Sequence, residues 1–288
     1  MRTPPLFLLF AMSALAADPI DLVVSKALGL YNKTDYPAAI HLLQPGTGDA
    51  KALELLGQAY FMNGEYKRAT DTLERAAALA PNSSMTFTWL GRAYGRRAET
   101  SFPVAALGYA QKTREHFETA VKLDPKNGEA VNDLYEFYIQ APAVVGGGME
   151  KARNLLPLIA EIDPVEVHFA RARMAEQKKQ YDQAETHYRN ALSMAPDQPG
   201  RVLDVANFLA KRGRFEEADQ LFERAEKLAP NSPKVAFQRA ESYVRAQRKL
   251  DEAQNLLRKY LGLPNLTPDD PPRAEAQKLL KKAQGGKA

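Results

Sequence analysis

Apolar and small residues recur at helical spacing along the chain, in a pattern that pairs successive helices. In the clearest copy, Leu56 and Tyr60 lie one turn apart, so they share one face of a predicted helix. Gly57 and Ala69 carry minimal side chains, which lets that helix and the next approach closely where they cross. Pro81 cannot continue a helix and is predicted to end the second one. The segment therefore predicts an antiparallel helix pair.

This helix pair repeats along the chain. The interval from Pro196 to Pro230 is 34 residues, and the intervals from Pro81 through Pro125 and Pro164 to Pro196 are 44, 39 and 32 residues. A unit of 34 residues with two insertions and one small deletion accounts for all of them. Such a repeat is the signature of a helical solenoid. About six to seven copies are predicted, at 20–49, 50–83, 84–127, 128–164, 165–198, 199–232 and 233–266.

The predicted solenoid spans residues 18–266, and two of its units carry extra residues. These insertions lie near 98–112 and 141–148, in both cases between the two helices of a unit. They should therefore lie on the same edge of the solenoid. The first insertion is apolar enough that we expect it to pack. Residues 267–288 are predicted to form a basic capping helix and tail, which covers the open hydrophobic end.

The recurring positions resemble the tetratricopeptide repeat family. The match includes Leu56-Gly57, Tyr60, Ala69 and Pro81 at the expected offsets, and several of these recur in other copies. The resemblance implies an all-α, right-handed superhelical solenoid of antiparallel helix pairs. It also implies that the first helix of each unit lines a concave groove that binds a partner. At groove-facing positions we expect Trp89, Arg92, Arg96, Asn132, Asp133, Glu136 and Arg173 as partner-binding residues.

Trp89 is the only tryptophan in the chain. The family's usual aromatic position in this unit is filled by Phe87, so Trp89 is not that structural residue. Arg92 and Arg96 follow it by one and two helical turns, and an aromatic ring beside guanidinium groups is typical of a recognition anchor. The alternative is that Trp89 packs against the apolar insertion of its own unit.

Some proteins of this family bind the C-terminal carboxylate of a chaperone through a clamp of lysine, asparagine and arginine. Glu54 and Gln58 occupy the positions that would require lysine and asparagine in one unit, and Trp89 replaces the asparagine of the next. The clamp is therefore absent, and a chaperone-tail partner is not expected.

The charge of the chain is mildly positive and unevenly placed. There are 39 Lys+Arg and 35 Asp+Glu, which gives a formal net charge of +4. The segment 245–288 alone holds ten basic and five acidic residues. This surplus is typical of a lysine-rich end cap, and weak contact with an anionic surface is the alternative. Because the excess is small and lacks interleaved aromatics, we do not expect a nucleic-acid partner.

Sequence motifs for catalysis or cofactor binding are not evident. The chain has no cysteine, which excludes disulfides and thiolate chemistry. His168 and His187 could meet across a helix pair, but we interpret them as structural, so neither a metal site nor a cofactor is expected. The glycines 146–148 lack the lysine of a phosphate loop and are expected to form a flexible loop. An enzyme that uses Asp133 and Glu136 as a carboxylate pair is a disfavoured alternative.

The first 17 residues resemble a secretory signal. Arg2 is followed by an apolar stretch, and Ala14-Leu15-Ala16 is a small-residue cleavage motif. The apolar run is shorter than the roughly 20 residues that a membrane span needs, and no later segment is apolar enough. The sequence thus predicts an exported, periplasmic or secreted scaffold that binds a protein or peptide. A glycan- or polymer-binding module of the cell envelope is the alternative.

Overall fold

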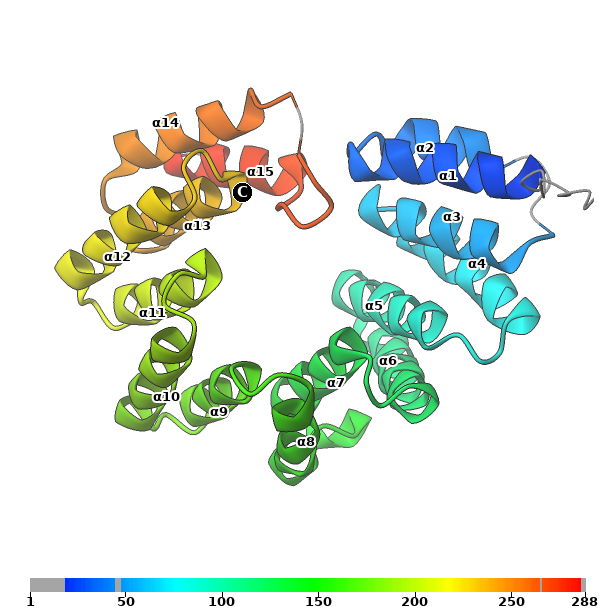
Figure 1. Cartoon of the computed structure of the whole chain (residues 1–288), viewed down its shortest axis with the longest axis horizontal. Helices are drawn as coiled ribbons and strands as arrows, with labels where there is room; N and C mark the ends of the chain where they lie inside the picture. Colours follow the sequence, from blue (N-terminus) through cyan, green and yellow to red (C-terminus); the bar gives the residue numbers. More distant parts are fainter. Residues whose placement is uncertain (1–18, 45–47, 265, 286–288) are drawn as a thin grey trace, which may run out of the picture.

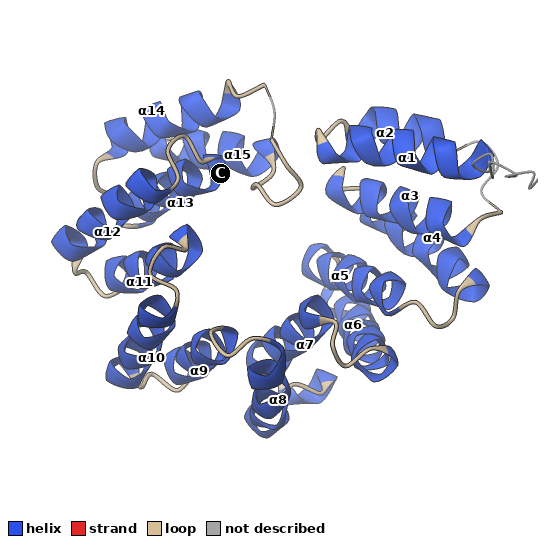
Figure 2. Cartoon of the chain, in the orientation of Figure 1, coloured by secondary structure: helices blue, strands red, loops and turns tan. Residues whose placement is uncertain are grey.

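The computed structural model describes residues 19–44, 48–264 and 266–285. Within these ranges the chain consists of α-helices and one short 3-10 helix, with no strand (Figure 2). The predicted all-α class is therefore confirmed. The predicted signal segment 1–17 lies outside the described residues.

Fourteen of the helices form seven consecutive antiparallel pairs, and the first and second helices of each pair are called A and B below. The A helices are α1 (Pro19–Asn32), α3 (Ala50–Met62), α5 (Ser84–Thr100), α7 (Gly128–Gln140), α9 (Glu166–Gln177), α11 (Pro199–Lys211) and α13 (Pro233–Arg245). The B helices are α2 (Tyr36–Leu43), α4 (Tyr66–Leu79), α6 (Pro103–Leu123), α8 (Met149–Ile162), α10 (Tyr181–Met194), α12 (Phe215–Leu228) and α14 (Leu250–Leu261). The helix α15 (Arg273–Ala283) packs on α13 and α14 at the end of the solenoid.

In five of the seven units, the short turn from A to B helix contains at least one residue in the left-handed region. Glycine adopts this conformation at Gly64 and Gly213, where φ is +80° and +76°. In three other units the same turn is made by Thr34, Lys179 and Gln247, with φ of +59°, +58° and +52°. Because a Cβ atom is strained in this conformation, these three turns carry a cost that the two glycine turns avoid.

The close crossing of helices within a unit follows from small residues, as predicted. A Cβ atom added at Gly57 would lie 2.4 Å from Cγ of Leu73, and one added at Gly91 would lie 2.4 Å from the ring of Phe117. Ala69 is completely buried at the same crossing as Gly57. Leu73 and Phe117 therefore fill the space that a larger side chain would need.

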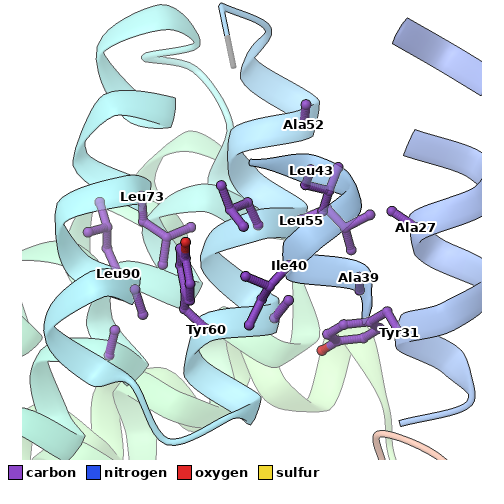
Figure 3. Packing of buried hydrophobic residues seen from close by; sticks show 14 of the residues in the cluster. Ala27, Tyr31, Ala39, Ile40, Leu43, Ala52, Leu55, Tyr60, Leu73 and Leu90 are labelled. Carbon is purple, nitrogen blue, oxygen red and sulfur yellow. The ribbon is translucent and has the colours of Figure 1, made fainter. Parts of the chain in front are cut away.

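The pairs stack into a superhelix that almost closes on itself (Figure 1). Successive A helices contact each other at most junctions, whereas no two successive B helices do so within the described part of the chain. The A helices consequently form the inner, concave surface and the B helices the outer one. Figure 3 shows how the core of the first units is built, with Tyr31, Ile40, Leu55 and Leu73 inserted between successive helices.

Both insertions form ordered structure, and the second packs against α6, the helix that the first one lengthens. The first lengthens α5 and α6, so that α6 begins at Pro103. Our expectation that this apolar stretch packs is wrong at its beginning, because Phe102 and Val104 are each 88% exposed. The second insertion forms the 3-10 helix η1 (Ala143–Val145), which contacts α6 and buries Val145.

The triple glycine of the second insertion makes a tight turn rather than an open loop. Gly146 has φ of +94°, and a Cβ atom there would lie 2.2 Å from the guanidinium of Arg114. A Cβ atom at Gly147 would lie 1.8 Å from the carbonyl oxygen of Ala141. The amide of Gly148 donates a hydrogen bond of 2.8 Å to the carbonyl of Tyr138. Glycine is thus needed at position 146 because of its positive φ, and at position 147 because the backbone passes close to that of Ala141.

Candidate functional site

A chain of ion pairs runs along the concave surface from α5 to α11. It joins the A helices of four successive units through three arginines, each of which is bound by two carboxylates. We call this set the concave ladder, and it consists of Arg92 with Glu129 and Asp133, Arg173 with Glu136 and Glu176, and Arg201 with Glu166 and Asp204.

The first set links α5 to α7. Nε of Arg92 donates a hydrogen bond of 2.6 Å to Asp133, and Nη2 lies 2.9 Å from Glu129. These two carboxylates are four residues apart on α7, so one guanidinium reaches both from the neighbouring helix. The predicted site residues Arg92 and Asp133 therefore bind each other.

The second set links α7 to α9. Glu136 accepts two hydrogen bonds from Arg173, of 3.2 Å from Nε and 3.0 Å from Nη2, which is the forked geometry typical of a strong arginine–carboxylate pair. Glu176 lies 3.5 Å from the same guanidinium and also accepts a hydrogen bond of 2.6 Å from the hydroxyl of Tyr188. Lys211 of α11 approaches Glu176 to 3.5 Å. Because Asp133 and Glu136 serve different arginines, they do not form an isolated carboxylate pair.

The third set links α9 to α11. Arg201 is only 15% exposed and forms ion pairs with Glu166 and, at 3.2 Å, with Asp204. The predicted site residue Asn132 donates a hydrogen bond of 3.4 Å to Glu166, which connects this set back to α7. The concave ladder is therefore continuous over four units.

Burial works against the negative charges of the ladder. It raises the pKa of Asp204 to about 6, although Arg201 pulls in the opposite direction. Burial likewise raises the pKa of Asp133 despite its bond to Arg92. The sign of both shifts shows that desolvation of these carboxylates outweighs the single cation that each of them contacts.

Trp89 lies at the start of the ladder. Its ring meets Phe61 of α3 edge to face, with 5.3 Å between ring centroids, and the guanidinium carbon of Arg92 lies 4.8 Å from the Trp89 ring centre. The expected second guanidinium is elsewhere, because Arg96 lies over the ring of Tyr66 at 5.3 Å and pairs with Glu99 at 2.6 Å. Trp89 is thus fixed by one arginine and one aromatic ring.

A cavity of about 670 Å³ opens beside Trp89, where the end of the superhelix returns to its beginning. We call it the closure cavity. Its walls come from the first three A helices, from α7 and from the turn that precedes α15, and they include Tyr31, Gln58, Trp89, Arg92, Glu129 and Asp269. Tyr31 and Asp269, which are 238 positions apart in the sequence, therefore share one site.

The turn at Asp269 and Asp270 is close enough to affect the first unit electrostatically. Burial raises the pKa of Tyr36 to about 12, and the two carboxylates of this turn add to the shift. Burial also raises the pKa of Tyr31 strongly, with a contribution from Asp269. The negative charge of this turn therefore raises the pKa of tyrosines at the opposite end of the chain.

His168 and His187 meet across a helix pair, as the sequence allowed. Their Nδ1 atoms lie 3.4 Å apart, which fits a hydrogen bond between two neutral rings. Burial lowers the pKa of both, and the positive charge of Arg171 lowers them further. Within the described residues no group of three or more metal-ligating side chains gathers, so this pair stands without a third ligand.

Two parts of the site were missed from the sequence, for different reasons. Glu166, Asp204 and Lys211 occupy the same groove-facing offsets as the predicted residues, so the same rule extended to later units would have found them. Tyr31 and Asp269 carry no local signal, because only the curvature of the whole superhelix brings them together.

Comparison with known proteins identifies the repeat directly. Residues 50–83 and 175–240 match models described as tetratricopeptide repeat. A tetratricopeptide repeat protein from Parabacteroides merdae has a similar fold, with a TM-score of 0.61 at 16% identity over 92% of this chain and 98% of that one. A thermophilic protein of the same repeat type from Thermus thermophilus gives a TM-score of 0.52 at 19% identity, over 69% of this chain and 98% of that one.

One curated relative also matches. DnaJ homolog subfamily C member 3 of Gallus gallus is 24% identical in an alignment 251 residues long, and the match covers 83% of this chain and 48% of the relative. The chain thus spans about half the length of that protein. No helix of the described part has both the length and the apolar character that crossing a bilayer requires.

The repeated helix pairs, the glycine and alanine crossings and the two matching stretches agree with one another. Repeats of this kind are generally non-catalytic scaffolds for protein interaction. The chain contains tetratricopeptide repeats at residues 50–83 and 175–240 and has the fold of a tetratricopeptide repeat solenoid.

Proposed function

We propose that this protein is an exported scaffold that holds an extended segment of a partner protein on its concave surface. The observation that carries the proposal is the concave ladder with the adjoining closure cavity. Together they present charged, amide and aromatic groups on successive A helices, facing inward. A chain in extended form can contact such a series one unit at a time.

The predicted site residues take two roles in this proposal. Trp89 supplies a large and firmly held contact surface, since Phe61 and Arg92 fix its orientation. The ladder residues Arg92, Asp133, Glu136 and Arg173 hold the A helices at a fixed spacing and present their remaining hydrogen-bonding capacity to the partner.

The partner-capture experiment uses a photo-crosslinking amino acid at Gln58, which lines the closure cavity. The matched control carries the same amino acid at Glu223, an exposed position on the B helix α12. We expect one defined protein to be crosslinked from Gln58 in cells of the native host and not from Glu223. Identical products from both positions, or none from Gln58, would count against a groove-binding scaffold.

A glycan or polymer ligand is a distinct outcome of a second measurement. Calorimetric titration of the purified protein with soluble cell-wall fragments would give saturable binding for a glycan-binding module. The same titration would give no saturable heat for a scaffold specific to protein segments.

Export is tested on the protein itself. The proposal rests on the signal-like residues 1–17, and it expects the mature chain to begin after Ala16 or Ala17. Mass spectrometry of the intact protein from the host would give the mass of the cleaved chain. An intact chain that begins at Met1 and remains in the cytoplasm would contradict the export part of the proposal alone.

A further inference from the structure

The closure cavity carries an excess of negative charge. Arg92 already binds both Glu129 and Asp133, so this set has a net charge of −1. Asp269 adds a second negative charge, and among the described residues its carboxylate has no hydrogen-bond or ion-pair partner. Of the groups that line the cavity, Glu129 and Asp269 are negative and Arg92 is positive, so the lining has an excess of one negative charge. Asp133, which binds Arg92 from outside the cavity, adds a further negative charge nearby, in a chain whose formal net charge is +4.

The walls of the cavity also suit a cation. Trp89 and Tyr31 are aromatic, and a positive group above such a ring is stabilised by the electrons of the ring face. Gln58 and Asn32 bring side-chain carbonyl oxygens, which accept hydrogen bonds from ammonium or guanidinium groups. Met85 completes an apolar wall against which an aliphatic stem can pack.

We propose that the closure cavity binds the lysine or arginine side chain of a basic segment in the partner. This inference rests on the proposed function and specifies the chemistry of its ligand. The aliphatic stem lies against Met85 and the ring of Trp89, and the charged head lies between Glu129 and Asp269. An acidic side chain would be repelled by the two carboxylates, and a neutral one would leave them without a new partner.

The position of Asp269 gives this site a second property. Asp269 precedes α15, whereas Tyr31 and Asn32 belong to the first helix of the chain. A cation held between Glu129 and Asp269 therefore bridges the last turn of the superhelix to its first units. Binding should draw the two ends of the superhelix together.

The test uses the single tryptophan as an intrinsic reporter. Four heptapeptides with blocked ends, Ser-Gly-Ser-Xaa-Ser-Gly-Ser, carry lysine, arginine, norleucine or glutamate at Xaa. We expect the lysine and arginine peptides to change the fluorescence of Trp89 with dissociation constants of about 1 mM, roughly tenfold tighter than the norleucine peptide. Raising the salt concentration should weaken the binding of both cationic peptides.

Two variants locate the charge, and a third is the control. We expect D269N to weaken binding of the lysine peptide about threefold and D269N/E129Q about tenfold. Asp197 is an exposed carboxylate in the loop before α11, outside the cavity, so D197N should bind like the wild type. Far-ultraviolet circular dichroism of each variant reports whether the helices are intact.

The outcomes separate this inference from the function on which it rests. Equal binding of the lysine and norleucine peptides, no response to lysine up to about 10 mM, or full binding by a folded D269N/E129Q variant would overturn the basic-side-chain site. A protein captured from Gln58 in the same circumstances would leave the scaffold function standing. Specific binding of the cationic peptides without any captured protein would support the site and contradict the scaffold function.

Discussion

Two carboxylates on the two helices of one unit, Asp204 on α11 and Asp219 on α12, sit in opposite electrostatic surroundings. On the concave surface, Asp204 shares Arg201 with Glu166, so two negative charges compete for one positive charge. At the junction of α12 with the turn between α13 and α14, Asp219 is bound by two cations, Arg248 at 2.6 Å and Lys249 at 2.8 Å. The concave region therefore has two acids for one cation, whereas the region around Asp219 has two cations for one acid.

The pKa values follow this reversal. Burial raises the pKa of Asp204 to about 6, because Arg201 is divided between two acids. Burial also acts to raise the pKa of Asp219, but hydrogen bonds from Arg248 and Lys249 outweigh it and hold the pKa well below its usual range. The difference shows that the charged groups beside each carboxylate, and not the net charge of +4, decide the local charge that each surface presents.

The largest expected effect is the removal of an arginine from the concave ladder. R201M leaves Glu166 and Asp204 half-buried without their cation, so we expect a loss of about 2 kcal/mol in the free energy of unfolding. K67A is the control, because Lys67 and Asp71 form an exposed pair within one helix that is worth at most about 0.5 kcal/mol. Urea denaturation at pH 7 measures both, and equal losses would mean that the ladder adds no stability.

The sharpest form of the comparison removes one carboxylate from each region. We expect D219N to lower the free energy of unfolding by about 1.5 kcal/mol, because it leaves two cations facing each other. D204N should raise it by about 1 kcal/mol at pH 7, because it relieves a carboxylate that is costly to ionise. Thermal or urea unfolding of the two variants should therefore show changes of opposite sign.

The pH dependence isolates Asp204. A raised pKa means that the folded state keeps the proton to higher pH than the unfolded state, whose aspartate pKa is about 3.9. The wild type therefore loses stability as pH rises from about 4 through the folded pKa of about 6, and D204N does not. The difference in the free energy of unfolding between D204N and wild type should grow by about 2 kcal/mol between pH 4 and pH 7.

The wild-type curve of unfolding free energy against pH must be subtracted from that of D204N, since the histidine pair changes the stability with pH in the opposite direction. Burial lowers the pKa of His168 and His187, so their contribution is lost as pH falls below about 6.5. Both proteins contain this pair, and it cancels in the difference. A flat difference curve would show that Asp204 titrates normally in the folded protein.

The smallest expected effect concerns the turns between A and B helices. Lys179 adopts φ of +58° at the position where two other units have glycine, so K179G should stabilise the protein by about 0.5 kcal/mol. Replacing the exposed neighbour Lys178, which has φ of −82°, by glycine should destabilise it slightly. Thermal denaturation of both variants shows whether the strain at Lys179 is real.

Most of the fold was predictable, because each repeat carries its own local pattern of small, apolar and proline residues. Gly57, Ala69 and Pro81 recur with a mechanical role, and the structure uses the two small residues as expected. The exposure of Phe102 was not predictable, since apolar composition does not reveal that a lengthened helix projects beyond its neighbours.

The site was predictable only in part. Groove-facing offsets within a unit identify Arg92, Asp133 and Arg173, but they say nothing about which charges pair across units. Pairing depends on the distance between successive A helices, and the closure cavity depends on the summed rotation of seven units. Small angular differences per unit would separate Asp269 from Tyr31, so their presence in one cavity depends on the whole chain and not on a motif within it.

The almost closed ring has a kinetic consequence for any partner. The concave surface faces inward from nearly all sides, so a segment reaches several A helices by passing along the axis of the ring with one end leading (Figure 1). A segment with a free terminus should therefore associate faster than the same sequence tethered at both ends or cyclised. Because the final contacts are the same, the tethered or cyclised segment should also dissociate more slowly, in the same proportion, so the topology of the partner would set its residence time more than its affinity.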